Sequence, residues 1–232
     1  MNRRLFALLA LSAFAFAFGC RTKELPHIKV TDFQDKRRTG NPIIKIACVG
    51  DSITYGSGVE GRETNSYPAQ LGEYLGAGFE VRNFGRSGAT LQKAGDLPYW
   101  TTDEAKAAEA FQPDVVILKL GTNDTKPQNW KGKAAFIADY RAMIDHFRGI
   151  KSRPKLWVCL PVPVYGDHWG INAATLDEVI EATQEACDKS KIPVIDLNDA
   201  LSGHPEMFPD KIHPDANGAA LMAKTVYQAI RP

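Results

Sequence analysis

The chain has 232 residues, with 28 Lys and Arg against 27 Asp and Glu and a formal charge of +1 at pH 7. This balance argues against nucleic-acid binding, which usually shows as a basic excess, and the short basic run at residues 36–38 is interpreted as part of a solvated linker. At roughly 100 to 200 residues per domain, the length predicts one large domain rather than two small ones.

A secretion signal is predicted over residues 1–19. Arg3 and Arg4 precede an apolar stretch at 5–18, which is too short to favour a membrane-spanning helix. The pair Gly19-Cys20 resembles the end of a lipoprotein signal, in which Cys20 becomes the lipid-bearing first residue. The alternative is an ordinary signal peptide cut nearby, with Cys20 incidental. We expect an exported protein, periplasmic or at the cell surface, whose membrane contact is a lipid anchor, and globomycin sensitivity would distinguish the anchored form.

Residues 20–41 are predicted to form a tether and residues 42–232 a single domain. Within that domain, short apolar runs alternate with longer segments of helical period, which is typical of a parallel sheet with helices on both faces. The expected strands are 43–49, 79–83, 115–120, 156–160 and 194–197. The expected helices are 66–75, 103–111, 133–148, 174–190 and 215–230. The sequence therefore predicts an α/β fold, a three-layer α/β/α sandwich.

Three cysteines follow Cys20 in the sequence. Cys48 and Cys159 lie in apolar strand-like runs and Cys187 on an expected helix, so we interpret all three as small buried side chains. Their spacing does not indicate a metal site. A disulfide between two of them stays open at this point, because exported proteins can form them.

Several polar residues follow the expected strands, where an open parallel sheet binds its ligands. Ser52 comes directly after the first strand and His213 after the last, and a serine nucleophile needs a base such as histidine. Asp210 precedes His213 by three residues, so in one helical turn both side chains would emerge on the same side. Gly88 and Asn123 follow the second and third strands and could donate N–H groups to an oxyanion. Each motif alone is also compatible with an ordinary turn.

Four sequence blocks in this order resemble the SGNH branch of the GDSL esterase and lipase family. They are Gly-Asp-Ser-Ile-Thr at 50–54, Asn-Phe-Gly-Arg-Ser-Gly at 83–88, Gly-Thr-Asn-Asp at 121–124 and Asp-Lys-Ile-His at 210–213. The resemblance extends over about residues 43–230. It implies the SGNH hydrolase fold, a flavodoxin-like arrangement of five parallel strands.

The resemblance also implies roles for individual residues. Ser52 would be the nucleophile, His213 the general base and then the general acid, and Asp210 the group that orients His213. The oxyanion hole would consist of the backbone N–H groups of Ser52 and Gly88 and the side chain of Asn123. No metal or organic cofactor is required for this chemistry.

The family acts on many esters, and the fold does not select among them. Export on a lipid anchor, aromatic residues in the loops and the lack of an evident long apolar lid favour removal of O-acetyl groups from carbohydrates, of the sialic acid or plant polysaccharide type. The expected partner is a small-molecule or oligosaccharide ester. An exported lysophospholipase or thioesterase is the alternative enzyme. A non-catalytic carbohydrate-binding surface lipoprotein is the alternative from another class, and the intact set of four polar side chains counts against it.

Further residues are candidates for the substrate pocket and its support. Lys126 and Trp130 follow Asn123 at a short distance, and His168 and Trp169 follow the fourth strand; all four are possible pocket residues. An aromatic ring there could stack on the face of a sugar. Lys119 is a charge inside an apolar strand, and we expect a structural role for it, with Asp51 as one possible partner.

Overall fold

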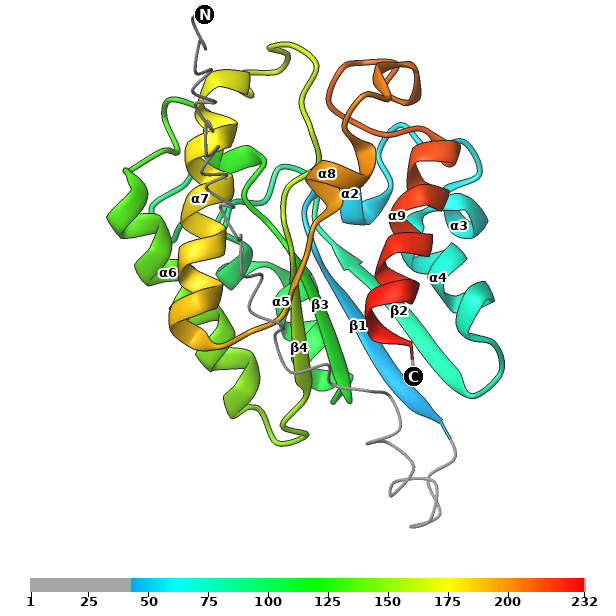
Figure 1. Ribbon diagram of the computed structural model, residues 1–232. Coiled ribbons are helices and arrows are strands. Elements are labelled where there is room, and N and C mark those ends of the chain that lie inside the picture. Colours follow the sequence, from blue (N-terminus) through cyan, green and yellow to red (C-terminus); the bar gives the residue numbers. More distant parts are fainter. Residues whose placement is uncertain (1–42, 232) are drawn as a thin grey trace, which may run out of the picture.

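A parallel sheet forms the centre of the computed structural model, which describes residues 43–231. Its strands are β1 Ile44–Gly50, β2 Phe79–Gly85, β3 Val115–Lys119, β4 Lys155–Cys159 and β5 Val194–Ile195. All neighbouring strands are parallel, in the order β2-β1-β3-β4-β5 (Figure 1). Every side chain of β3 is buried, as expected for a strand covered on both faces. The predicted α/β class and the flavodoxin-like strand order are confirmed.

Helices cover both faces of the sheet (Figure 1). The longer helices are α4 Tyr67–Leu75, α5 Asp103–Ala110, α6 Lys133–Gly149, α7 Ala173–Ser190 and α9 Ala216–Ile230. The short helices are α2 Ser52–Tyr55, α3 Arg62–Asn65 and α8 Leu197–Leu201, and 3₁₀ turns lie at Tyr99–Thr101, Asn123–Thr125 and Pro205–Met207. One buried apolar cluster lies between the sheet and α5, α6 and α7, and a second lies between the sheet and α4, α8 and α9.

Amphipathic helices explain this layering. In α6 the side chains of Phe136, Tyr140, Met143, Ile144 and Phe147 recur at steps of three and four residues, and all five are buried. Fully burying an aliphatic or aromatic side chain of this size contributes about 1.5 to 3 kcal/mol. The apolar stripe of α6 is therefore sufficient to hold that helix against the sheet.

The cysteines belong to these two clusters. Cys48, Cys159 and Cys187 are buried and free, so the interpretation as small buried side chains is confirmed. Burial raises the pKa of the Cys48 and Cys187 thiols to about 12 each. Since the thiolate is the reactive form, these thiols are held in an unreactive state.

Two strands differ by two residues from their predicted bounds. β2 ends at Gly85 rather than at residue 83, and β5 is shorter than predicted. This strand ends at Ile195 rather than at residue 197, because the side chain of Asp196 accepts a hydrogen bond from the Asp199 N–H and starts α8. The short helices α2, α3 and α8 were not predicted, since four or five residues are too few to show a helical period. No helix within residues 43–231 is long and apolar enough to cross a membrane. The predicted signal, Cys20 and the tether lie outside the described residues.

Candidate active site

Ser52 lies on a sharp turn between β1 and α2. Gly50 ends the strand, and a Cβ atom there would lie 2.1 Å from the Thr54 Oγ1 and 2.5 Å from the Lys119 carbonyl oxygen. Only glycine fits where the backbones approach this closely. Asp51 then starts α2, because its side chain accepts a 2.9 Å hydrogen bond from the Ile53 N–H. The turn fixes the backbone of Ser52 at the carboxyl edge of the sheet.

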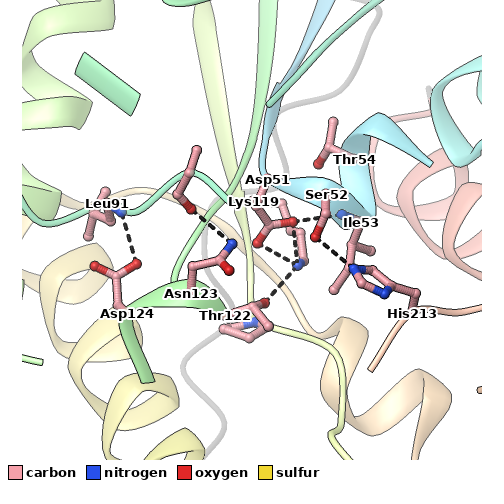
Figure 2. A network of polar contacts seen from close by, with 12 residues as sticks. Asp51, Ser52, Ile53, Thr54, Leu91, Lys119, Thr122, Asn123, Asp124 and His213 are labelled. Carbon is pink, nitrogen blue, oxygen red and sulfur yellow. Dashed lines mark hydrogen bonds and ion pairs between the residues drawn. The ribbon is translucent and has the colours of Figure 1, made fainter. Parts of the chain in front are cut away.

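His213 and Asp210 meet Ser52 in one hydrogen-bonded chain. The His213 Nε2 lies 2.8 Å from the Ser52 Oγ (Figure 2), and the His213 Nδ1 lies 2.8 Å from the Asp210 Oδ2. Between Asp210 and His213 the chain forms a tight bend, in which Lys211 has a φ of +71°. The predicted helical turn is therefore wrong. The Asp210 Oδ1 stabilises this bend, because it accepts hydrogen bonds from the N–H groups of Ile212 and His213.

The ionisation of Asp210 sets the roles of the two imidazole nitrogens. Partial burial raises the pKa of Asp210, but hydrogen bonds from the His213 N–H, the His213 ring and the Ile212 N–H lower it further, to below its ordinary value. The group is therefore a carboxylate at neutral pH and accepts a hydrogen bond from the His213 Nδ1–H. Nε2 is then left as the acceptor for the Ser52 hydroxyl hydrogen, as a general base requires.

Three N–H donors, one of them the backbone N–H of Ser52 itself, lie at the cavity that holds the Ser52 hydroxyl. Among residues 43–231, the backbone N–H groups of Ser52 and Gly88 donate no hydrogen bond. Gly88 has a φ of +83°, a backbone conformation that other residues rarely adopt. The Asn123 Nδ2 donates to the Ala89 carbonyl oxygen at 3.1 Å, which orients the carboxamide and leaves its second N–H free. Ser52, Gly88, Asn123 and His213 all line one cavity of about 250 Å³.

Asp124 connects the loop of Asn123 to the loop that contains Gly88. Its carboxylate accepts a 2.9 Å hydrogen bond from the Leu91 N–H (Figure 2) and a 2.8 Å hydrogen bond from the Gln92 N–H. Burial raises the pKa of Asp124 to about 7, and the two N–H donors oppose this rise. No role for Asp124 was predicted from the sequence. Its position directly after Asn123 in the Gly-Thr-Asn-Asp block was the only available signal.

A buried ion pair with Lys119 holds the side chain of Asp51. The Lys119 Nζ lies 3.2 and 3.1 Å from the two carboxylate oxygens of Asp51 and 3.0 Å from the Thr122 Oγ1 (Figure 2). Both side chains of the pair are fully buried. Burial lowers the pKa of Lys119, and the Asp51 carboxylate opposes that shift. Asp51, named as one possible partner of Lys119, is the partner in the structure, and the pair joins the end of β3 to the start of α2.

Substituting Lys119 by Met is expected to destabilise the fold by about 3 to 5 kcal/mol, because the Asp51 carboxylate would remain buried without a cation. Urea unfolding followed by circular dichroism measures this. The double variant Asp51→Asn/Lys119→Met should regain much of the loss, since Asn removes the charge and still starts a helix well. A loss below about 1 kcal/mol for Lys119→Met would contradict the proposed importance of the pair.

The rest of the cavity wall differs from the predicted one. Trp169 and Lys126 line it, together with three residues that were not predicted from the sequence: Ser57, Ser87 and Ile171. Trp130 does not, and this expectation is corrected. The Trp130 N–H donates to the Lys126 carbonyl oxygen, and the Trp130 ring packs on Phe136 of the core at a centroid distance of 5.6 Å.

His168 also lies outside the cavity lining. Its Nδ1 lies 2.9 Å from the Asp210 carbonyl oxygen, and its ring packs on Trp169 at a centroid distance of 4.4 Å. This position links the loop after β4 to the loop of Asp210. A contact of His168 with substrate stays a prediction.

Comparison with known proteins places the chain in a family. The model of the GDSL-like lipase/acylhydrolase family matches residues 48–221. An acetylxylan esterase from Xylanibacter ruminicola is 39% identical over an alignment of 207 positions, which covers 81% of this chain and 43% of that protein. The chain thus spans less than half the length of this relative.

Solved structures share the fold. A carbohydrate acetylesterase from Sinorhizobium meliloti superimposes with a TM-score of 0.66 at 20% identity, covering 80% of this chain and 97% of that one. The acetyl xylan esterase AlAXEase superimposes with a TM-score of 0.63 at 23% identity, covering 81% of this chain and 100% of that one. The match of the family model over residues 48–221 shows that the chain belongs to the GDSL-like lipase/acylhydrolase family.

Proposed function

We propose that this protein is a serine ester hydrolase that removes O-acetyl groups from carbohydrates. The hydrogen-bonded chain from Asp210 through His213 to Ser52 carries the proposal, because it supplies a nucleophile, a base and an orienting carboxylate at one cavity. The 39% identity to an acetylxylan esterase supports an acetylated polysaccharide as the substrate class.

In the first step, the Ser52 Oγ attacks the ester carbonyl carbon while the His213 Nε2 takes the hydroxyl proton. The Asp210 carboxylate stabilises the imidazolium that forms. The carbonyl oxygen becomes an oxyanion, which the N–H groups of Ser52, Gly88 and Asn123 stabilise.

The tetrahedral intermediate then collapses. The carbon–oxygen bond to the alcohol breaks, and His213 gives its proton to the leaving alcohol oxygen. This leaves an acetyl ester on Ser52. A water molecule, deprotonated by His213, attacks that ester through a second oxyanion in the same site, which releases acetate and restores the Ser52 hydroxyl.

Asn123→Ala is expected to lower kcat by about 10² to 10³, because it removes one of three donors that stabilise the oxyanion. Initial rates on p-nitrophenyl acetate measure this, with Asn217→Ala on the exposed start of α9 as a matched control. KM should change little, since the donor acts mainly in the transition state. An unchanged kcat would remove Asn123 from the oxyanion hole.

The volume of the cavity favours ester substrates with a short acyl group. Its volume of about 250 Å³ lies at or below the lower end of the range of roughly 300 to 1,000 Å³ that is usual for ligand pockets. A cavity of this size has little room for a long acyl chain beside the alcohol. Lysophospholipase activity, the alternative within the family, would need such room.

Substrate comparison tests the proposed function. Acetate release from O-acetylated xylan and from O-acetylated sialic acids should be compared with hydrolysis of p-nitrophenyl acetate, butyrate and octanoate. We expect kcat/KM to fall steeply as the acyl chain lengthens, and at least one of the acetylated sugars to be a substrate. Preference for octanoate, or no release of acetate from either sugar, would refute the proposal.

We also propose that the protein is exported and anchored by a lipid on Cys20. The proposal rests on the charged and apolar pattern of residues 1–19 and on the Gly19-Cys20 pair. Expression in the presence of globomycin should cause the unprocessed precursor to accumulate. Normal processing under globomycin would favour an ordinary signal peptide instead.

A further inference from the structure

Trp169 occupies a backbone conformation that is unusual for a large side chain. The Ile171 N–H donates a 2.9 Å hydrogen bond to the His168 carbonyl oxygen, and these two residues form an antiparallel bridge. The two residues between them have positive φ angles, +51° for Trp169 and +77° for Gly170. Positive φ at both central positions defines a type I′ turn, in which Asn and Gly are preferred. An aromatic residue in the first of these positions is held there against its own backbone preference.

The turn is fastened to the active-site loops on several sides. The His168 ring contacts the Asp210 carbonyl oxygen through Nδ1 at 2.9 Å. After the turn, the Asn172 N–H donates to the Thr125 Oγ1 at 3.1 Å. The position of Trp169 relative to the site is therefore set by contacts to the loops of both Asp210 and Asn123.

The Trp169 ring is exposed at the cavity and does not pack in the core. Its side chain is 59% exposed, more than any other large hydrophobic side chain of residues 43–231. It lines the cavity of Ser52, and its ring centroid lies 5.1 Å from that of His213. An exposed indole in a disfavoured turn stabilises the fold little, which favours a binding role for Trp169.

The mechanism determines which part of the substrate lies beside Trp169. His213 gives its proton to the leaving alcohol oxygen, so the alcohol portion of the ester must lie next to the imidazole. Trp169 packs against that imidazole. The indole therefore contacts the alcohol portion of the substrate and not the acyl group, which must lie near the oxyanion donors.

The remaining cavity wall is complementary to a sugar ring. A sugar presents a face of C–H groups and an edge of hydroxyl groups. Trp169 and Ile171, from the loop after β4, supply an apolar wall for the face. Ser57 and Ser87, whose hydroxyl oxygens are 3.0 Å apart, line the same cavity from the loops after α2 and β2. Because β2 and β4 lie on opposite sides of β1 and β3 in the sheet, these polar and apolar walls come from different sides of the site.

We propose that Trp169 is the stacking platform of a sugar subsite that binds the ring whose acetyl ester is cleaved. This inference rests on the proposed deacetylase function and names the residue that selects its alcohol portion. Trp169 is a specificity-determining residue in this account. It is not required for the chemistry at Ser52.

Trp169→Asn is the most informative variant, because Asn favours the positive φ of this turn and removes the ring. Trp169→Ala removes the ring without relieving the turn, and Trp169→Phe keeps an aromatic face. The substrates are O-acetylated xylo-oligosaccharides, followed by acetate release, and ethyl acetate, followed by titration of the released acid. Ethyl acetate is preferable to p-nitrophenyl acetate here, since a nitrophenyl ring could itself stack on the indole.

For Trp169→Asn and Trp169→Ala we expect KM for the oligosaccharide ester to rise roughly tenfold, a size typical for loss of one aromatic contact. The loss of kcat/KM for ethyl acetate should be several-fold smaller than the loss for the oligosaccharide ester, because an ethyl group covers much less of the indole than a sugar ring. Trp169→Phe should keep most of the affinity, and Trp169→Asn should melt at or above the wild-type temperature. Tyr74→Ala, which removes another exposed aromatic side chain on α4, should change neither substrate.

Three results would overturn the proposal in distinguishable ways. If Trp169→Asn lost activity equally on both substrates, Trp169 would act through His213 and not through a sugar. If the variants left KM for the oligosaccharide unchanged, the subsite would be refuted while the deacetylase function stood. If the wild type hydrolysed ethyl acetate but no sugar ester, the proposed function and the subsite would both fail.

Discussion

Ser52→Ala is expected to lower kcat for hydrolysis of p-nitrophenyl acetate by about 10⁶. The Ser52 Oγ lies 2.8 Å from the His213 Nε2 and lines the cavity with the three N–H donors. Without the hydroxyl no acyl-enzyme can form, and only the residual catalysis of the binding site and the oxyanion donors remains, about 10³ to 10⁴ over water. Steady-state rates at high enzyme concentration, together with mass spectrometry of the acetylated intermediate, measure the loss.

The non-additivity of the site sharpens this test. His213→Ala should cost about as much as Ser52→Ala, and the double variant should cost no more than either alone, because nucleophile and base act as a unit. Ser202→Ala, on the exposed loop after α8, controls for an unspecific effect of losing a serine. Hydrolysis that persisted at the wild-type rate in Ser52→Ala would refute the serine mechanism. Activity that depends on Ser52 would in turn exclude the non-catalytic binding protein.

The sequence predicted the elements with strong periodicity and missed the short ones. The five strands and five longer helices were predicted because runs such as Val115–Lys119 and stripes such as that of α6 contain enough residues to show a period. The helix α2 has four residues and depends on the Asp51 side chain and the close approach at Gly50. Such tertiary and capping effects leave no period in the sequence.

The same distinction holds within the active site. Ser52, Gly88, Asn123, Asp210 and His213 follow strand ends in order, so the sheet topology brings them to one edge, as the sequence analysis expected. Positions in long loops were not predictable in this way. Trp130 and Trp169 looked alike in the sequence, but a turn folds Trp130 onto the core while a type I′ turn holds Trp169 at the cavity. The direction of a loop side chain depends on backbone angles that residue type alone does not fix.

Lys119 shows what can and cannot be predicted from one charged residue in an apolar strand. Lys119 had to find a carboxylate because an unpaired buried charge is costly. Several carboxylates were available, and only the structure shows that the partner is the residue before the nucleophile. The pair therefore contributes both to stability and to the placement of Ser52, since Asp51 also accepts the Ile53 N–H that starts α2.

Asp210→Asn is expected to lower kcat by about 10⁴ while leaving the fold and KM nearly unchanged. The Asn side-chain oxygen can still accept the N–H groups of Ile212 and His213, which preserves the bend. Its NH₂ group would then replace the Asp210 Oδ2 and face the His213 Nδ1 as a donor. The ring must then carry its proton on Nε2, so a hydrogen rather than a lone pair faces the Ser52 Oγ.

This prediction separates an orienting role from a merely structural one. A structural carboxylate would show its loss in the melting temperature, whereas a tautomer defect leaves a folded protein that binds the ester and turns it over slowly. Asp177→Asn on the exposed face of α7 removes the same charge far along the chain from the bend and should behave as the wild type. The lowered pKa of Asp210 means that the wild-type carboxylate stays ionised through the neutral range, so the comparison at pH 7 tests the charged form directly. A kcat within tenfold of the wild type for Asp210→Asn would show that the bend alone orients His213 and that the carboxylate charge is dispensable.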